Sequence, residues 1–240
     1  MDHAQFFLAG GMTVPTQKTF ESDTIATSAG DLQITFLGHG SLLFAFGGQS
    51  IYVDPYGQVA DYGQLPEASV VLITHEHHDH LDPEALSKVR TAETVVVANE
   101  AGARQVAGAI AMRPGDVRTV KGLQVEAVPA YNVVHKRPNG QPFHPKGVGV
   151  GYVLTFGNQR VYVAGDTENI PEMKALRDID IAFLPMNLPY TMAPEMVADA
   201  ARAFRPRILY PYHYGETDTS RLAALLGSEQ GIEVRIRRLA

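Results

Sequence analysis

Four of the nine histidines of this chain lie within one six-residue segment, His75–His80, which reads HEHHDH. The segment directly follows the apolar run Val70–Ile73, which is typical of a strand buried on both faces. It ends just before Asp82–Glu84, where an N-cap residue, a proline and an acidic residue predict the start of a helix. Histidines held between a buried strand and a capped helix favour a metal site over a loose, histidine-rich surface loop.

The spacing within this segment predicts ligands for two ions. At the end of a strand, residues i and i+2 point the same way, so His75 and His77 can present two imidazoles to one ion. The chain must then turn toward the helix that begins at Asp82, which brings Asp79 and His80 to the same place from another direction. One short loop can therefore supply two ligands to each of two neighbouring ions.

The amino-acid composition further limits the possible metal ligands and binding partners. The chain has no Cys, which excludes disulfides, Cys-ligated zinc or iron–sulfur sites and a Cys nucleophile, so metal ligands must be His nitrogens and carboxylate oxygens. The net charge of −6 disfavours binding to a polyanion such as nucleic acid. The apolar stretch Phe6–Met12 is too short to cross a bilayer and lacks the basic start of a signal peptide. We therefore expect a cytoplasmic protein that does not bind membranes.

Short apolar runs separated by Gly and Asp predict an α/β protein whose second half repeats the pattern of the first. The predicted order is a β-meander followed by alternating strands and helices, twice, which two sheets covered by helices on their outer faces would bury. We expect a lead-in segment over residues 1–30 and a single domain over residues 31–240. The predicted strands are Leu32–Leu37, Ser41–Phe46, Gln49–Val53, Val70–Thr74, Thr94–Ala98, Val117–Val120, Leu123–Val128, Val148–Phe156, Arg160–Ala164, Ile179–Leu184, Arg207–Tyr210 and Glu233–Arg238. The predicted helices start at Pro83 and span Glu100–Ala109, Ala193–Phe204 and Thr219–Leu226.

The segment His75–His80 resembles the H-x-H-x-D-H signature of the metallo-β-lactamase superfamily. Asp54 after an early strand, Asp166 after a hairpin and His213 after a late strand match further positions of that family in order. The resemblance spans Leu32 to about Tyr214 and implies the four-layer αββα sandwich, in agreement with the predicted elements.

The resemblance also implies a binuclear metal site. The first ion would be held by His75, His77 and one loop histidine, the second by Asp79, His80 and His213, with Asp166 as the bridge and Asp54 orienting the histidine loop. His and carboxylate ligands suit zinc, with manganese, iron or nickel as alternatives. A water shared by two such ions would have its pKa lowered toward ~7, giving a hydroxide that Asp79 helps to orient.

One position departs from the family pattern. The superfamily usually has a histidine after the strand that ends at Pro129–Tyr131, but residue 132 is Asn. His135 and His144 in the same loop are the two possible substitutes, and Pro145 beside His144 slightly favours the latter. His3 and His78 fall outside the motif spacing and are predicted not to be ligands.

The run Gly38–Ser41 (GHGS) resembles the start of the lactonase-like, uncharacterised metal-dependent hydrolase branch of the family. His39 could serve there as a further ligand or a proton donor, or as a structural histidine in a turn. Asn187 and Tyr190 follow a buried strand and are candidates for substrate contact. Lys146 could bind a phosphate or carboxylate, although an ordinary solvated charge explains it as well.

These features favour a metal-dependent hydrolase that acts on a small-molecule substrate, such as an ester, a lactone or a phosphorylated metabolite. The alternatives are an RNA or DNA phosphodiesterase of the same superfamily, or a non-catalytic metal-binding protein. The phosphodiesterase is less favoured because the chain has neither a basic surplus nor spare length for a nucleic-acid-binding domain. No apolar stripe is left over to indicate a dimer.

Overall fold

The computed structural model describes residues 19–240; most of the predicted lead-in segment and His3 lie outside these described residues. Two seven-stranded sheets form the molecule, and each has its strands in sequence order. The first sheet contains β1 (Glu21–Thr27), β2 (Gly30–Gly38), β3 (Ser41–Phe46), β4 (Gln49–Val53), β5 (Val70–Ile73), β6 (Val95–Ala98) and β7 (Ile110–Ala111). The second contains β8 (Val117–Val120), β9 (Leu123–Ala130), β10 (Gly149–Phe156), β11 (Gln159–Val163), β12 (Ile181–Pro185), β13 (Ile208–Tyr212) and β14 (Glu233–Val234).

Each sheet changes from antiparallel to parallel pairing halfway across. Strands β1 to β4 and β8 to β11 pair antiparallel; short turns join these neighbours except β9 and β10, which residues 131–148 connect. Strands β4 to β7 and β11 to β14 pair parallel. The carboxyl ends of parallel strands lie at one edge of a sheet, and this is where ligands usually bind in open α/β sheets. The predicted repeat of the first half in the second is therefore confirmed by the topology.

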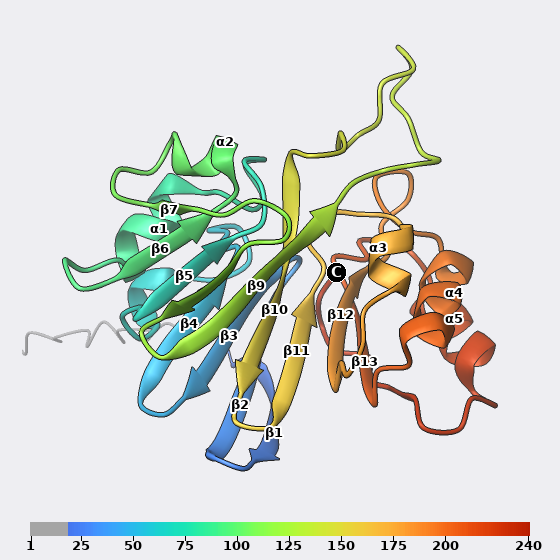
Figure 1. Ribbon diagram of the computed structural model, residues 1–240, viewed down its shortest axis with the longest axis horizontal. Coiled ribbons are helices and arrows are strands. Elements are labelled where there is room, and N and C mark those ends of the chain that lie inside the picture. Colours follow the sequence, from blue (N-terminus) through green and yellow to red (C-terminus); the bar gives the residue numbers. More distant parts are fainter. Residues whose placement is uncertain (1–18) are drawn as a thin grey trace, which may run out of the picture.

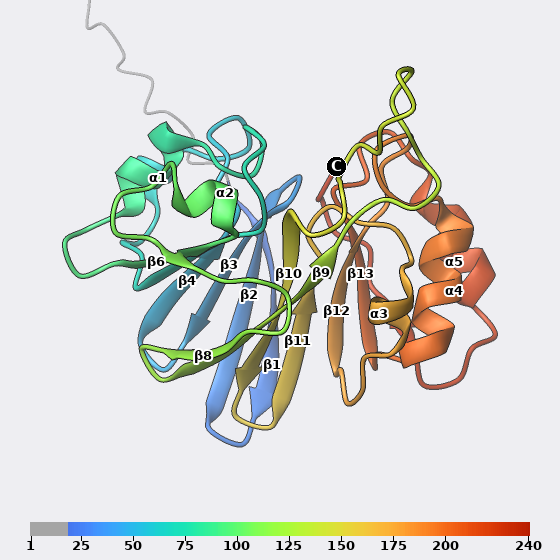
Figure 2. The ribbon, with the colours of Figure 1, turned by 45° about the horizontal axis from the view of Figure 1, so that its top comes forward.

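The two sheets pack face to face, and helices cover both outer faces (Figures 1 and 2). The first sheet carries η1 (Tyr62–Gln64), α1 (Pro83–Val89) and α2 (Glu100–Ala103), and the second carries α3 (Pro171–Lys174), α4 (Pro194–Phe204) and α5 (Thr219–Leu226). Buried side chains between the sheets include Phe36, Phe44, Phe156 and Phe183. Separate apolar clusters fill the space between each sheet and its helices. The predicted αββα sandwich is confirmed.

Helix α1 begins where its sequence predicts. The Asp82 carboxylate accepts hydrogen bonds from the backbone amides of Glu84 and Ala85, and Pro83 occupies the first helical position. Helix α2 ends at Ala103 and is shorter than the predicted Glu100–Ala109; the positive φ of 76° at Gly108 is also incompatible with a right-handed helix that reaches Ala109. Among residues 19–240, no helix is both long and apolar enough to span a membrane.

The structure corrects the predicted start of the domain at residue 31. Strand β1 pairs with β2 along its whole length, from Glu21 opposite Phe36 to Thr27 opposite Gly30. The sequence of β1, ESDTIAT, has one large apolar residue, so its pattern gives no strand signal.

The predicted last strand, Glu233–Arg238, is also shorter in the structure. It ends at Val234, although the backbone amide of Arg235 still donates to the Leu209 oxygen of β13. Beyond this point, the guanidinium groups of Arg235 and Arg237 pair with Asp23 of β1.

Asp23 ties the first strand to the opposite sheet, so we expect Asp23→Ala to destabilise the fold. Its carboxylate accepts hydrogen bonds from the Tyr210 hydroxyl of β13 and from Arg235 and Arg237. Losing charged hydrogen bonds at this partly buried position should lower the free energy of unfolding by about 2 kcal/mol. Urea unfolding compares it with Asp31→Ala, an exposed position in β2. Equal stability of the two variants would contradict this assignment.

Candidate metal centre

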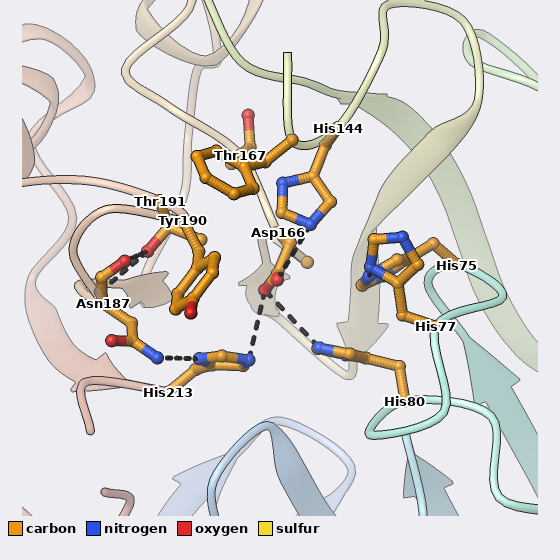
Figure 3. Close-up of polar contacts among 12 residues, drawn as sticks. His75, His77, His80, His144, Asp166, Thr167, Asn187, Tyr190, Thr191 and His213 are labelled. Carbon is orange, nitrogen blue, oxygen red and sulfur yellow. Dashed lines mark hydrogen bonds and ion pairs between the residues drawn. The ribbon is translucent and has the colours of Figure 1, made fainter. Parts of the chain in front are cut away.

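The loops that follow the parallel strands bring most of the predicted ligands together at one edge of the two sheets (Figure 3). His75 follows β5 of the first sheet, whereas Asp166 and His213 follow β11 and β13 of the second. His144 comes from the long loop 131–148 between β9 and β10, which rises above this edge (Figure 1). Residues far apart in the sequence thus face one another because the sheets pack with these edges adjacent.

The first group of possible ligands consists of His75, His77 and His144, whose ring nitrogens lie within 4.8 Å of one another. His75 Nε2 is 3.0 Å from His77 Nδ1. The centroid of the His144 ring is 5.2 Å from that of His75 and 5.1 Å from that of His77. Three imidazoles converging in this way match the donor set that zinc and related ions take from proteins.

The second group consists of His39, Asp79, His80 and His213. Asp79 Oδ2 is 3.0 Å from His39 Nε2, 3.5 Å from His213 Nε2 and 3.7 Å from His80 Nε2. Burial would raise the pKa of Asp79, but the imidazoles of His213 and His39 beside its carboxylate hold this pKa below its usual range. Asp79 is therefore an ionised carboxylate aimed at three imidazoles.

Asp166 lies between the two groups. Its Oδ2 is 3.2 Å from His144 Nε2 of the first group, and its Oδ1 is 3.6 Å from the Nε2 atoms of both His80 and His213 in the second. Each carboxylate oxygen thus faces a different group, as the dashed lines of Figure 3 show. This is the arrangement that a bridging carboxylate requires.

The buried carboxylate of Asp54 anchors the histidine segment 75–80. Asp54 accepts hydrogen bonds from the Thr74 amide at 2.8 Å and the Thr74 hydroxyl at 2.6 Å, and its Oδ2 is 2.8 Å from His80 Nδ1. With Nδ1 engaged, His80 turns Nε2 toward Asp79 and Asp166. This is the contact that the predicted orienting role of Asp54 requires.

Opposing charges set the protonation of the site. Burial alone would lower the pKa of His80, but the carboxylates of Asp166 and Asp54 raise it to about 9. Burial disfavours ionisation of Asp166, but His213 and His80 hold its pKa well below the usual range. Burial lowers the pKa of His75 well below its ordinary value, so this imidazole is neutral at pH 7. A positive charge stabilises the buried carboxylates, and either a proton on an imidazole or a divalent cation can provide it.

Three buried polar atoms at the centre test whether the residues fit a cation. His80 Nε2, Asp166 Oδ1 and His213 Nε2 have no hydrogen-bond partner among residues 19–240. An unsatisfied buried polar atom costs about 1–3 kcal/mol, so three of them facing one another need a common partner. A cation bound between these atoms would satisfy all three. The donor set therefore fits the metal ions that the sequence implies.

The structure separates the two candidates for the third histidine of the first group. His144 is buried beside His75 and His77, whereas His135 Nδ1 lies 2.8 Å from Glu168 Oε1 and belongs to neither group. Asn132, at the position where the family has histidine, accepts hydrogen bonds from the backbone amide of His144 at 2.8 Å and contacts its Nδ1 at 2.7 Å. Asn132 thus fixes the orientation of the His144 ring.

Glu168 is a residue of this site that sequence reasoning missed. Its fully buried carboxylate accepts hydrogen bonds from the backbone amides of Val133, Val134 and His135 and from Asn132 Nδ2. These bonds outweigh the effect of burial and lower the pKa of Glu168. Its position two residues after Asp166 was the available signal, but an acid there is too common to predict an anchor for loop 131–148.

The remaining predicted residues are placed as follows. Asn187 Nδ2 is 3.5 Å from His213 Nδ1, so Asn187 contacts a possible ligand. Tyr190 lies on the same side of the site as His213 and Asn187 (Figure 3). Lys146 is engaged by Glu172 and the Tyr131 hydroxyl, so the structure does not bring it to the metal groups. The side chain of His78 is 84% exposed, and His78 belongs to neither metal group, in line with its prediction as a non-ligand.

Comparison with known proteins places this geometry in a family. The model of the β-lactamase superfamily domain matches residues 33–213. A metal-dependent hydrolase of Methanoculleus marisnigri is 32% identical over 225 residues, which cover 85% of this chain and 97% of that protein.

Comparison with solved structures leads to the same family. A candidate metal-dependent hydrolase from Parabacteroides distasonis has a TM-score of 0.88 and 48% identity, covering 92% of this chain and all of that chain. Igni18, a metallo hydrolase from Ignicoccus hospitalis, shares the fold at a TM-score of 0.72 and 22% identity, covering 87% of this chain and 96% of that one. The chain therefore belongs to the metallo-β-lactamase superfamily, in the group of metal-dependent hydrolases that these relatives represent.

Proposed function

We propose that this protein hydrolyses a small ester or lactone with the help of two divalent cations, zinc being the first choice. The observation that carries the proposal is the placement of Asp166 between two ligand groups, with three unpartnered buried atoms facing one another. His75, His77 and His144 would hold one cation, and Asp79, His80 and His213 the other. Imidazole and carboxylate donors suit zinc, and manganese, iron and nickel accept the same donors.

Bound cations would lower the pKa of a water toward ~7 and polarise the scissile carbonyl. Side chains of the protein would orient the reacting groups and transfer protons. Asp79 accepts a proton or a hydrogen bond through the carboxylate that faces the centre. His39 Nε2, 3.0 Å from Asp79 Oδ2, can hold that carboxylate in place or relay the proton to the leaving group. His39 is thus proposed as a catalytic residue rather than a turn histidine.

The surroundings of the site favour an ester or lactone over a phosphorylated substrate. Lys146, the charge predicted to bind a phosphate, is paired with Glu172. The overall charge of −6 offers no field that would attract a nucleic acid. Asn187 and Tyr190, beside His213, remain candidates for contact with the substrate.

Substituting the two loop histidines separately tests the metal site. We expect His144→Ala to lose about one cation per chain, because this histidine completes the first group. His135→Ala, the matched control from the same loop, should keep close to two. Elemental analysis of metal-loaded, desalted protein measures the stoichiometry, and circular dichroism checks the fold. Metal loss in His135→Ala with full retention in His144→Ala would reverse the assignment.

Replacing Asp79 tests the catalytic proposal. Changing partners of a metal ligand typically costs 10–100-fold in affinity or activity, so Asp79→Ala should lower kcat/KM for ester or lactone hydrolysis by at least about 100-fold. The neighbouring exposed His78→Ala should leave kcat/KM within about twofold. A screen of lactones, thioesters and phosphodiesters with metal-loaded protein identifies the assay substrate. Unchanged turnover in Asp79→Ala would remove Asp79 from the mechanism.

A further inference from the structure

Exposed apolar side chains gather on two loops beside the metal centre. Among residues 19–240, the exposed large apolar side chains are Val117, Val133, Val134, Val148, Leu188, Tyr190 and Ile236. Val133 and Val134 are 54% and 65% exposed in loop 131–148, and Leu188 and Tyr190 are 43% and 46% exposed in the loop after β12. We call these four residues, with the half-buried Phe143, the apolar rim. Single exposed apolar residues are ordinary, but a cluster next to a functional site indicates binding.

The contacts that orient the candidate ligands also join these two loops. Asn132, which holds His144, donates a hydrogen bond from Nδ2 to the backbone oxygen of Tyr190 at 2.9 Å. The rings of Phe143 and Tyr190 meet edge to face, with centroids 5.1 Å apart. On the other loop, Asn187 contacts His213. The two loops that carry the rim are therefore joined to each other, and each also carries an asparagine that contacts a candidate metal ligand.

The side chains of Val133 and Val134 are exposed because hydrogen bonds hold their backbone in place. The amides of Val133 and Val134 donate to Glu168 Oε2 at 2.7 Å and 2.6 Å, which points the backbone inward and leaves the side chains in water. The polar side chains between the rim and the centre already have partners, because Asn132 is bonded to His144 and His135 is bonded to Glu168. The rim thus offers hydrocarbon to a molecule entering the site, with a cation against it, because the Arg137 guanidinium carbon lies 5.0 Å from the centroid of the Phe143 ring.

We propose that the apolar rim binds the hydrocarbon part of the substrate, an acyl or alkyl chain of several carbons attached to the bond that is hydrolysed. This inference rests on the proposed hydrolase function and names its substrate class. Covering exposed Val, Leu and Tyr side chains with a chain of this kind removes apolar surface of both partners from water. A substrate that is small and polar throughout would leave the rim exposed and gain nothing from it.

A series of 4-nitrophenyl esters from acetate to octanoate tests the substrate class with the metal-loaded protein. Burial of one methylene is worth a factor of about three to four in affinity, so kcat/KM should rise by up to that factor per methylene. The double variant Val133→Ser/Val134→Ser and the single variant Leu188→Ser should flatten this dependence and leave the rate with acetate nearly unchanged. Val117→Ser is the matched control, because Val117 is equally exposed but lies on β8, far from the rim (Figure 2).

Calorimetric binding of butyrate, octanoate and dodecanoate to metal-free protein gives a readout that does not depend on hydrolysis. Affinity should increase with chain length in the parent protein and in Val117→Ser, but not in the rim variants. If no ester is hydrolysed while chain-length-dependent binding persists, the hydrolase proposal fails and the rim assignment stands. If esters are hydrolysed at rates independent of chain length and binding is equally flat, the rim assignment is overturned. It is likewise overturned if the rim variants change only co-sedimentation with phosphatidylcholine vesicles.

Discussion

The site depends on one buried carboxylate, that of Asp54, at the carboxyl end of β4. Asp54 is fully buried, adopts a positive φ of 45° and bonds both Thr74 at the end of β5 and the ring of His80. A carboxyl group buried this deeply is tolerated only when hydrogen bonds satisfy its oxygens, and here Thr74 and His80 supply them. The hydrogen bonds to Asp54 therefore fix the conformation of the histidine segment.

The second sheet adds another carboxylate, that of Asp166. Asp166 and Asp79 both face the Nε2 atoms of His80 and His213. Similar left-handed conformations at His39 and His213, with φ of 53° and 46°, mark the two strand ends that close the site from the far side. Strained backbone that recurs at one place is characteristic of a functional site. His213 donates its backbone amide to His39, and His39 donates its own to Ala240, so the end of the described chain supports the same corner.

Loop 131–148 links ligand geometry to substrate choice. Glu168 accepts hydrogen bonds from the backbone amides of Val133 and Val134 and from Asn132. Asn132 in turn contacts His144, while the side chains of the two valines are exposed to solvent. One buried acid thus positions a possible metal ligand and the proposed hydrocarbon-binding surface together. Substitutions of Asn132 or Glu168 should therefore affect metal affinity, whereas side-chain changes at Val133 and Val134 should alter the chain-length preference alone.

The amino-acid sequence by itself determined the αββα sandwich, the start of α1 and the segment His75–His80, because strand periodicity, capping and ligand spacing are local properties. Only the tertiary structure shows that His144, and not His135, lies beside His75 and His77, because His135 contacts Glu168, a residue 33 positions away in the sequence. The contacts of Asp23 in β1 were likewise visible only in the tertiary structure, because its partners Tyr210 and Arg235 lie more than 180 positions away. Long-range hydrogen bonds to buried carboxylates leave no pattern in a sequence, and these bonds gave the site and the termini their final form.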